Sequence, residues 1–209
     1  MIRVAVAGAG GKMGRMVLEA LAEQPKIVLL VAALEHGTHP GQGAEAIPGV
    51  LLSHDLSVAL DAADVVIDFS APDSTVACAR AAAAAGVPMV TGTTGLAEAA
   101  QAVLRHAATR IPIVASPNFS RGINLLLTLA ELAARALGPE FDLELVELHH
   151  AAKRDAPSGT ALLLADALAR GRGGAATLAT HYELGKPAAP RSTAEIGVAV
   201  LRGGDVVGE

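Results

Sequence analysis

Short aliphatic runs alternate with longer stretches of helical period through the first 120 residues of the chain. The continuous apolar runs predict strands at Ile2–Ala7, Ile27–Ala33, Val65–Phe69, Val87–Thr91 and Ile111–Ala115. Apolar positions three and four residues apart predict helices at Lys12–Glu23, Asp73–Ala85 and Leu96–Thr109. Uninterrupted apolar strands separated by helices are typical of a parallel sheet covered on both faces. We therefore predict a doubly wound α/β, Rossmann-type domain over residues 1–120.

The pattern changes after Pro117. The expected elements there are a helix at Gly122–Leu137, a strand at Phe141–Leu148, a helix at Ser158–Ala169 and, after a polar loop with Pro187 and Pro190, two strands around an Arg-Gly-Gly-Asp turn within Glu195–Glu209. We assign residues 121–209 to a smaller α+β domain for substrate binding and oligomerisation. Because the chain stops where the last predicted strand ends, we expect this domain to be truncated at its C-terminus.

Composition narrows the class of protein. Hydrophobic residues make up 52% of the 209 residues and charged residues 18%, a balance that argues against disorder. The net charge of -5 and the 2% of aromatic residues argue against a nucleic-acid partner. No apolar run has membrane-spanning length without Gly, Pro or charge. The single cysteine, Cys78, excludes an internal disulfide framework and fits a reducing cytoplasm.

A glycine-rich segment, Gly8-Ala-Gly-Gly-Lys-Met-Gly14, follows the first predicted strand and opens the first predicted helix. Such glycines permit a tight turn and close approach of a pyrophosphate, and the helix N-terminus supplies N–H donors. Glu35 ends the second predicted strand 21 residues later, where an acid can bind ribose hydroxyls. A chance glycine-rich turn is the alternative. The candidate dinucleotide-binding residues here are Gly8, Ala9, Gly10, Gly11, Lys12, Met13, Glu35 and His36.

The choice between NADH and NADPH depends on Glu35 and His36. A carboxylate repels a 2′-phosphate and so favours NADH. A basic neighbour offsets this repulsion, but an imidazole is only weakly cationic near neutral pH. We expect NADH to be favoured and NADPH to be tolerated.

Two further turns end predicted strands at the carboxyl edge of the sheet, where cofactors bind. They are Thr91-Gly-Thr-Thr-Gly95 and Ser116-Pro-Asn-Phe119. The first is suited to contact nicotinamide or ribose, or is an ordinary turn in which Thr94 caps the next helix. In the second, Asn118 hydrogen-bonds a carboxamide or closes the turn. The candidate cofactor residues are Gly92, Thr93, Thr94, Ser116, Pro117, Asn118 and Phe119.

Candidate chemistry concentrates in the segment Glu147-Leu-His-His-Ala-Ala-Lys-Arg-Asp-Ala-Pro-Ser-Gly-Thr-Ala161. Two imidazoles and two cations suit a dianionic substrate and proton delivery. Ser158 caps the following helix, or the N–H groups at the helix start hold a carboxylate. A solvated basic loop is the alternative. A metal site is weaker, because adjacent strand residues such as His149 and His150 point to opposite faces.

This segment resembles the signature of the 4-hydroxy-tetrahydrodipicolinate reductases. The segments Gly-Ala-Gly-Gly-x-Met-Gly, Gly-Thr-Thr-Gly, Asn-Phe-Ser and the closing Arg-Gly-Gly-Asp-Val-Val-Gly-Glu match that family in the same order. The resemblance implies NAD(P)H-dependent reduction of a small cyclic dicarboxylate in diaminopimelate and lysine biosynthesis, by a homotetramer. This chain departs from the family pattern at two places. NADPH-preferring members often carry arginine at the position of His36, and the family normally continues beyond the last residue of this chain.

The resemblance also implies roles for individual residues. His149 is the principal acid/base residue, Lys153 the proton donor, and His150 a substrate contact. The remaining substrate-binding residues are Ser158, Gly159 and Thr160, of which the last two hold a carboxylate.

Two rival functions stay open from the sequence. Another two-domain dehydrogenase, acting on aspartate semialdehyde or a sugar, has a similar cofactor half. Thioester chemistry needs a catalytic cysteine, however, and Cys78 falls within a predicted helix. The second rival is a non-catalytic module that senses nicotinamide nucleotides, which has no need of His149 and Lys153.

Overall fold

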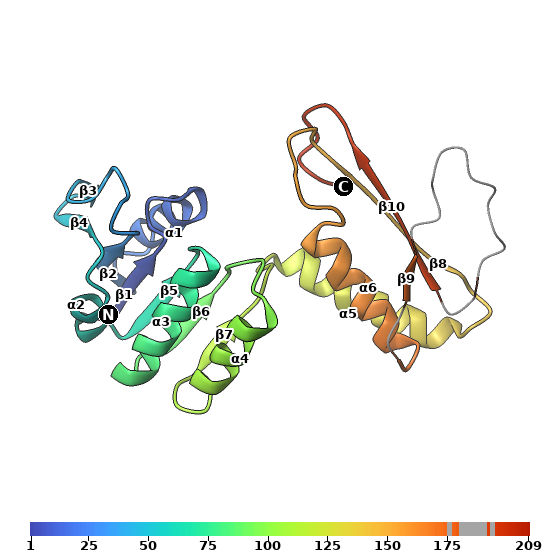
Figure 1. Cartoon of the computed structure of the whole chain (residues 1–209), viewed down its shortest axis with the longest axis horizontal. Coiled ribbons are helices and arrows are strands. Elements are labelled where there is room, and N and C mark those ends of the chain that lie inside the picture. The colour runs from blue at the N-terminus through green and yellow to red at the C-terminus, as the bar shows by residue number, and fades with distance from the viewer. Residues whose placement is uncertain (175–176, 180–191, 193–194) are drawn as a thin grey trace. The chain divides into compact units, whose positions relative to one another are not determined.

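The computed structural model describes residues 1–174, 177–179, 192 and 195–209 (Figure 1). The chain divides into two compact units, Met1–Pro117 and Asn118–Glu209. The predicted loop with Pro187 and Pro190 lies outside the described residues. Among the described helices, none combines the length and the apolar character that crossing a membrane requires.

The first unit is built on a seven-stranded sheet with the order β3-β4-β2-β1-β5-β6-β7. Its elements are β1 (Ile2–Ala7), α1 (Lys12–Ala22), β2 (Val28–Leu34), β3 (Glu45–Ile47), β4 (Val50–Ser53), α2 (Leu56–Ala62), β5 (Val65–Asp68), α3 (Pro72–Ala85), β6 (Met89–Thr91), α4 (Glu98–Ala107) and β7 (Ile113–Ala115). All strand pairs are parallel except β3 with β4. The strands and helices predicted for this unit are confirmed, while β3, β4 and α2 were not predicted.

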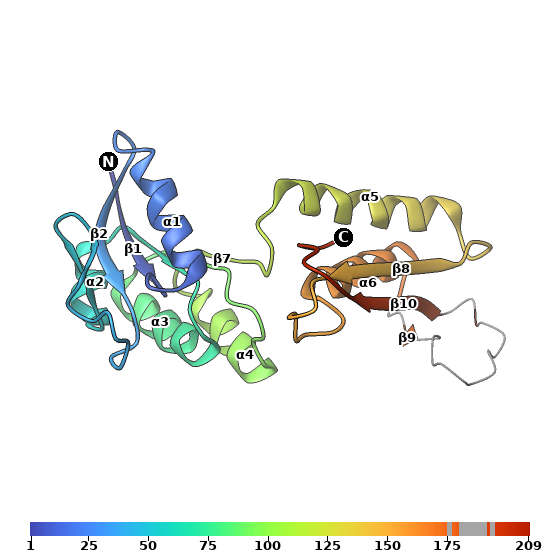
Figure 2. The ribbon, with the colours of Figure 1, turned by 90° about the horizontal axis from the view of Figure 1, so that it is seen from above.

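The last four side chains of β1 point alternately to the two faces of this sheet and are buried on both. Val4 and Val6 belong to one apolar cluster with Leu18 of α1. Ala5 and Ala7 belong to the other cluster, which α2, α3 and α4 complete. Figure 2 accordingly shows α1 on one side of the sheet and α3 and α4 on the other. This doubly wound arrangement gathers the carboxyl ends of the central parallel strands at one edge.

The second unit contains a three-stranded parallel sheet with the order β8-β10-β9. Its elements are α5 (Arg121–Leu137), β8 (Leu143–His149), α6 (Gly159–Gly171), β9 (Thr177–Ala179) and β10 (Glu195–Arg202). Ala165 and Ala169 of α6 pack on the sheet against Ile196. At Gly171, α6 also comes so close to α5 that a Cβ would overlap the carbonyl oxygen of Glu131. Small residues on α6 therefore let this helix pack closely against its neighbours.

The prediction of a second strand within Glu195–Glu209 is wrong. β10 ends at Arg202, and the chain turns at Gly204 without pairing back onto β10. The turn is tied instead to the end of β8, because the Gly203 N–H donates to His149 and the Ala151 N–H donates to Gly204. This places the turn beside the segment that carries the candidate chemistry.

Candidate active site

The glycine turn after β1 is shaped by contacts that exclude side chains. Gly8 has φ +76°, the left-handed region that favours glycine. A Cβ at Gly8 would overlap the carbonyl oxygen of Phe69, and a Cβ at Gly14 would overlap that of Gly8. The first turn of α1 therefore lies directly on the loop, and its N-terminus has unpaired N–H groups available for an anion.

Glu35 closes over this turn from the end of β2. Its Oε2 accepts the Gly10 N–H at 3.0 Å, and its Oε1 accepts the His36 N–H at 3.0 Å. The side chain of Gln42 donates to the carbonyl oxygens of Glu35 and His36 and so holds this strand end. The structure thus brings the candidate acid and the glycine turn together, as the spacing predicted.

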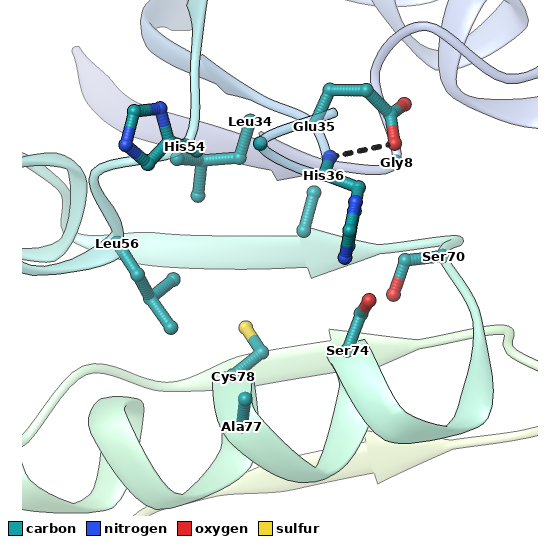
Figure 3. A pocket seen from close by; sticks show the side chains of 12 residues that line it. Gly8, Leu34, Glu35, His36, His54, Leu56, Ser70, Ser74, Ala77 and Cys78 are labelled. Atoms are coloured by element: carbon teal, nitrogen blue, oxygen red, sulfur yellow. Dashed lines mark hydrogen bonds between the residues drawn. The ribbon is translucent and has the colours of Figure 1, made fainter. Parts of the chain in front are cut away.

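A cavity of about 270 Å³ lies beside Glu35 (Figure 3). Its lining residues are Ala7, Gly8, Leu34, Glu35, His36, Gly37, His54, Leu56, Ser70, Ser74, Ala77 and Cys78. Aliphatic walls with a few polar groups at the rim suit a flat heteroaromatic base and its ribose. Sequence reasoning named Gly8, Glu35 and His36 but missed the others. His54 and Leu56 were missed because β4, which precedes them, was not predicted.

Cys78 contributes an inert wall to this cavity. Burial raises the pKa of its thiol to about 12, and the negative charge of Asp68 adds to the rise. The thiol therefore stays protonated near neutral pH. This excludes Cys78 as the nucleophile that thioester chemistry requires.

Of the two other predicted cofactor turns, Thr91–Gly95 lies in the first unit and Ser116–Phe119 spans the boundary between the units. Gly92 lies against the ring of Phe69, where a Cβ would overlap the aromatic carbons. Thr94 is exposed and does not cap a helix, since α4 starts at Glu98 with Ala97 in the capping position. Thr94 lies too far before the helix to reach its first N–H groups, so the capping alternative is wrong.

Ser116 and Pro117 end the first unit, whereas Asn118 and Phe119 begin the second. The Ser116 N–H donates to Thr91, which ties this turn to β6. The side-chain oxygen of Asn118 accepts the Ser120 N–H at 2.8 Å, so Asn118 does close a turn. Its amide nitrogen donates to the Thr160 hydroxyl at 3.2 Å.

In the second unit, a buried carboxylate organises the candidate chemistry. Glu147 is 4% exposed and accepts the Ser158 N–H at 3.1 Å and an Arg202 guanidinium N–H at 3.0 Å. The Nδ1 atom of His149 lies 3.8 Å from Glu147. Burial opposes ionisation of this carboxyl, but the hydrogen bonds from Ser158 and Arg202 outweigh it and lower its pKa. Glu147 is therefore a fixed negative charge beneath His149.

Arg202 anchors the loop that follows β8. Besides Glu147, it donates at 2.6 Å to the carbonyl oxygen of Asp155. The parallel register places Arg202 opposite His149. Neither Glu147 nor Arg202 was named as a site residue from the sequence. The alternation along Leu143–His149, which places residues 147 and 149 on one face, was the available signal for Glu147.

Lys153 lies within the same loop. Its Nζ atom is 2.8 Å from the Asp155 carboxylate, and its side chain is 20% exposed. The hydrogen bond from Lys153 lowers the pKa of Asp155 more than burial raises it. The side chain of His149 is 17% exposed. The imidazole of His149 and the side-chain amine of Lys153 are thus both held within this one unit and remain within reach of solvent.

The start of α6 provides a place for an anion. Ser158 is 4% exposed, and its hydroxyl caps the helix by accepting the Ala161 N–H at 3.1 Å. The capping alternative predicted for Ser158 is confirmed. The N–H groups of Gly159 and Thr160 have no acceptor within the helix, and a Cβ at Gly159 would meet nothing within 4 Å. Together with the Thr160 hydroxyl, they form a set of donors for a carboxylate.

Within the part of the chain that the structure describes, no three His, Cys, Asp or Glu side chains group to hold a metal ion. The second unit does hold an imidazole at His149, an amine at Lys153 and N–H donors at the start of α6, groups that can transfer protons and bind anions.

Known proteins match this chain along nearly its whole length. The family models described as dihydrodipicolinate reductase, N-terminus and C-terminus, match residues 2–119 and 122–209. The 4-hydroxy-tetrahydrodipicolinate reductase of Alkalilimnicola ehrlichii is 44% identical over 99% of this chain and 80% of the relative. That of Rhodopseudomonas palustris is 45% identical over 100% of this chain and 79% of the relative.

A solved structure extends the likeness to three dimensions. Dihydrodipicolinate reductase from Paenisporosarcina sp. TG-14, with dipicolinate bound, has a TM-score of 0.75 and 27% identity. The match covers 100% of this chain and 81% of that protein. Both family models and these relatives show that the chain belongs to the dihydrodipicolinate reductase family.

Proposed function

We propose that this protein reduces 4-hydroxy-tetrahydrodipicolinate to tetrahydrodipicolinate with NADH or NADPH, as a step of diaminopimelate and lysine biosynthesis. Family membership supports the reaction. The observation that supports particular residues is the arrangement at the end of β8. The Glu147 carboxylate lies 3.8 Å from His149 Nδ1 and accepts the N–H of Ser158 at the start of α6. Arg202 donates to Glu147 and to the Asp155 carbonyl oxygen in the loop that carries Lys153.

The residues of the first unit fit a dinucleotide, because Gly8 and Gly14 let the glycine turn pack onto the start of α1, whose N–H groups suit a pyrophosphate, and because a cavity lies beside Glu35. A bound nicotinamide supplies a hydride to the substrate ring. The candidate contacts are those of the glycine turn, of Glu35 and His36, and of the turns at 92–94 and 116–119. Ala7, Leu34, His54, Leu56 and Ser74 join them as walls of the cavity that takes the adenosine half.

The second unit handles the proton and the dianion. Conversion of the hydroxy compound takes up one hydride and one proton and releases one water. Lys153 is the proposed proton donor, and its Nζ atom lies 2.8 Å from the Asp155 carboxylate. His149, above the ionised Glu147, is the proposed acid/base partner. Loss of the 4-hydroxyl as water needs a proton on that oxygen, a task that suits either group.

The substrate carboxylates are proposed to bind at the start of α6. The N–H groups of Gly159 and Thr160 and the Thr160 hydroxyl donate to one carboxylate, with His150 as a further contact. Because the Ser158 hydroxyl is buried in the helix cap, we give Ser158 an indirect role in substrate binding, through the position of the helix start.

Dipicolinate binding tests this subsite without turnover. Dipicolinate is a stable planar dicarboxylate, and calorimetric titration in the presence of NADH is expected to detect it. Thr160→Val should weaken binding about tenfold, because it leaves a carboxylate with one donor fewer. Thr128→Val, which removes an exposed hydroxyl from α5, is the matched control and should leave binding unchanged. Equal affinities in all three proteins would contradict the proposed subsite.

NADH is the proposed preferred cofactor. The Glu35 carboxylate lies at the glycine turn, where it repels a 2′-phosphate. His36 does not offset this charge as an arginine would, and its Nδ1 atom is engaged 2.9 Å from the Thr38 hydroxyl. The ratio of the Kd values for NADPH and NADH measures the preference, which His36→Arg should move toward NADPH.

A cytoplasmic homotetramer is the proposed assembly of the family protein. Val146 and Leu201 are 68% and 52% exposed. By the strand register they lie on the sheet face opposite the one that Leu143 and Leu145 turn toward α6. Exposed apolar positions on a sheet face support self-association. Light scattering on the purified chain measures its mass in solution.

A further inference from the structure

Asp68 is a buried carboxyl group to which the proposed reaction assigns no role. It ends β5 and is 0% exposed. Among the described residues, no lysine or arginine pairs with it. Its carboxylate is satisfied instead by the hydroxyls of Ser70, Thr75, Thr91 and Thr93 and by the Ser70 N–H. A buried carboxyl group that has no cationic partner depends on these hydrogen bonds.

The donors come from the loops that surround the nucleotide site. Ser70 follows β5 and lines the cavity beside Glu35, as Figure 3 shows. Thr91 ends β6 and donates to Asp68 Oδ2 at 2.7 Å. Its hydroxyl also accepts the Thr93 N–H at 3.3 Å, so Thr91 connects Asp68 to the Gly92–Thr94 turn. Thr75, by contrast, lies within α3 and donates to the same oxygen at 2.7 Å.

Phe69, the next residue, extends the same connection to the glycine turn. Its N–H donates to Ala7, and its carbonyl oxygen occupies the space that a Cβ at Gly8 would need. Its ring occupies the corresponding space at Gly92. The turns after β1, β5 and β6 therefore meet around residues 68 and 69.

We propose that Asp68 is a positioning residue for the dinucleotide, which sets the turns after β5 and β6 in one arrangement through the Ser70, Thr91 and Thr93 hydroxyls. The proposal rests on the assignment of the first unit as the dinucleotide site. A carboxylate suits this task because both of its oxygens only accept, so that every surrounding hydroxyl must point its hydrogen inward. The loops thereby lose alternative arrangements before the cofactor arrives.

Two buried threonines provide a matched test. Thr91→Val and Thr75→Val each remove one 2.7 Å hydrogen bond to Asp68 Oδ2 with little change of volume. Each should lower Tm by about 2–4 °C. Thr91→Val should also raise the Kd for NADH about tenfold, since the loss of one buried hydrogen bond then reaches the turn. Thr75→Val should leave that Kd unchanged.

ADP separates the two halves of the site. Titration with ADP probes the cavity beside Glu35 but not the Gly92–Thr94 turn, which we assign to the nicotinamide half. Thr91→Val should therefore leave the Kd for ADP unchanged. Asp68→Asn places an amide N–H among hydroxyl donors and loosens Ser70 as well, so it should weaken both ADP and NADH. If Asp68 only stabilises the fold, Thr91→Val should change the Kd values for NADH and ADP alike.

The outcomes are distinguishable from failure of the proposed function. If the wild-type chain binds NADH, and Thr91→Val and Thr75→Val change its Kd equally, the positioning role is contradicted while the dinucleotide site stands. If the wild-type chain is folded and binds neither NADH nor NADPH, both proposals are overturned. Binding by direct fluorescence titration keeps either result independent of turnover.

Discussion

Glu147 lies in the proposed site, and its ionisation also contributes to the stability of the fold. Its pKa is lowered in the folded protein from an ordinary value of 4.5, because the bonds from Ser158 and Arg202 outweigh burial. The unfolded chain therefore takes up the proton first as the pH falls. The stabilisation from Glu147 is fully present above the unfolded pKa and is lost as the pH falls through the lower, folded pKa.

Unfolding of wild type and Glu147→Gln between pH 3 and pH 7, roughly the range spanned by carboxyl titration, tests this assignment. The variant should be less stable by about 2 kcal/mol at pH 7, because Arg202 loses its ionic partner. The difference between the two proteins should shrink toward acid pH. A difference that is constant across the range would show that the charge of Glu147 is irrelevant to the fold.

Lys153 is the proposed proton donor. Lys153→Ala should lower kcat about 100-fold while the Kd for NADH stays unchanged, because the side chain lies in the second unit and acts on the substrate. Arg154→Ala, which removes an exposed positive charge from the same loop, is the control and should retain most activity. Parallel losses in both variants would assign the loop a general electrostatic role instead.

At the scale of the elements, the first helix depends on its contact with the loop before it. A Cβ at Gly14 would overlap backbone atoms of Gly8 and Ala9, which cannot move aside cheaply. Gly14→Ala should therefore displace α1, weaken NADH binding at least about tenfold and lower Tm.

Gly122→Ala is the matched helical control, since a Cβ there meets nothing nearer than the Ser120 hydroxyl at 3.7 Å. It should raise stability by up to about 1 kcal/mol, because alanine loses less conformational freedom than glycine. Thermal unfolding and NADH titration of both variants provide the comparison. Normal NADH affinity in Gly14→Ala would show that the glycine turn does not contact the cofactor.

The elements that the sequence predicts most clearly are those that are both long and buried. The apolar run Ile2–Ala7 and the periodic stretch Asp73–Ala85 define β1 and α3 because both are buried and long. β3 and β4 are mostly exposed or half-buried, and Pro48 and Gly49 interrupt the apolar pattern between them. The equally short β6 and β7 were predicted because each ends a five-residue apolar run. The valines near the chain end have strand propensity, but their segment is tied to β8 through the turn at Gly204.

The candidate site divides in the same way. Gly8, Gly14 and Glu35 could be identified because a dinucleotide turn requires fixed spacings along the chain. Asp68 and Arg202 could not, because their partners are brought together by sheet topology: Arg202 lies 55 residues from Glu147. No local pattern marks a carboxylate that will be buried among threonines of neighbouring strands.

At the scale of the whole molecule, the chain combines two compact units with separate tasks. The first holds the dinucleotide turn and the Asp68 cluster, and the second holds His149, Lys153 and the α6 start. The family relatives share both units, and the chain spans about 80% of their length. The proposed reduction uses groups of both units, so an activity measurement on this chain tests both assignments together.

The most direct measurement generates the unstable substrate in place from pyruvate and aspartate semialdehyde with its synthase. The protein is then added, and the absorbance of NADH or NADPH is followed in parallel reactions. We predict oxidation that requires the complete substrate mixture, is faster with NADH and is lost in Lys153→Ala. A folded protein that binds NADH but oxidises neither nucleotide would contradict the reductase assignment and favour a nucleotide-sensing module.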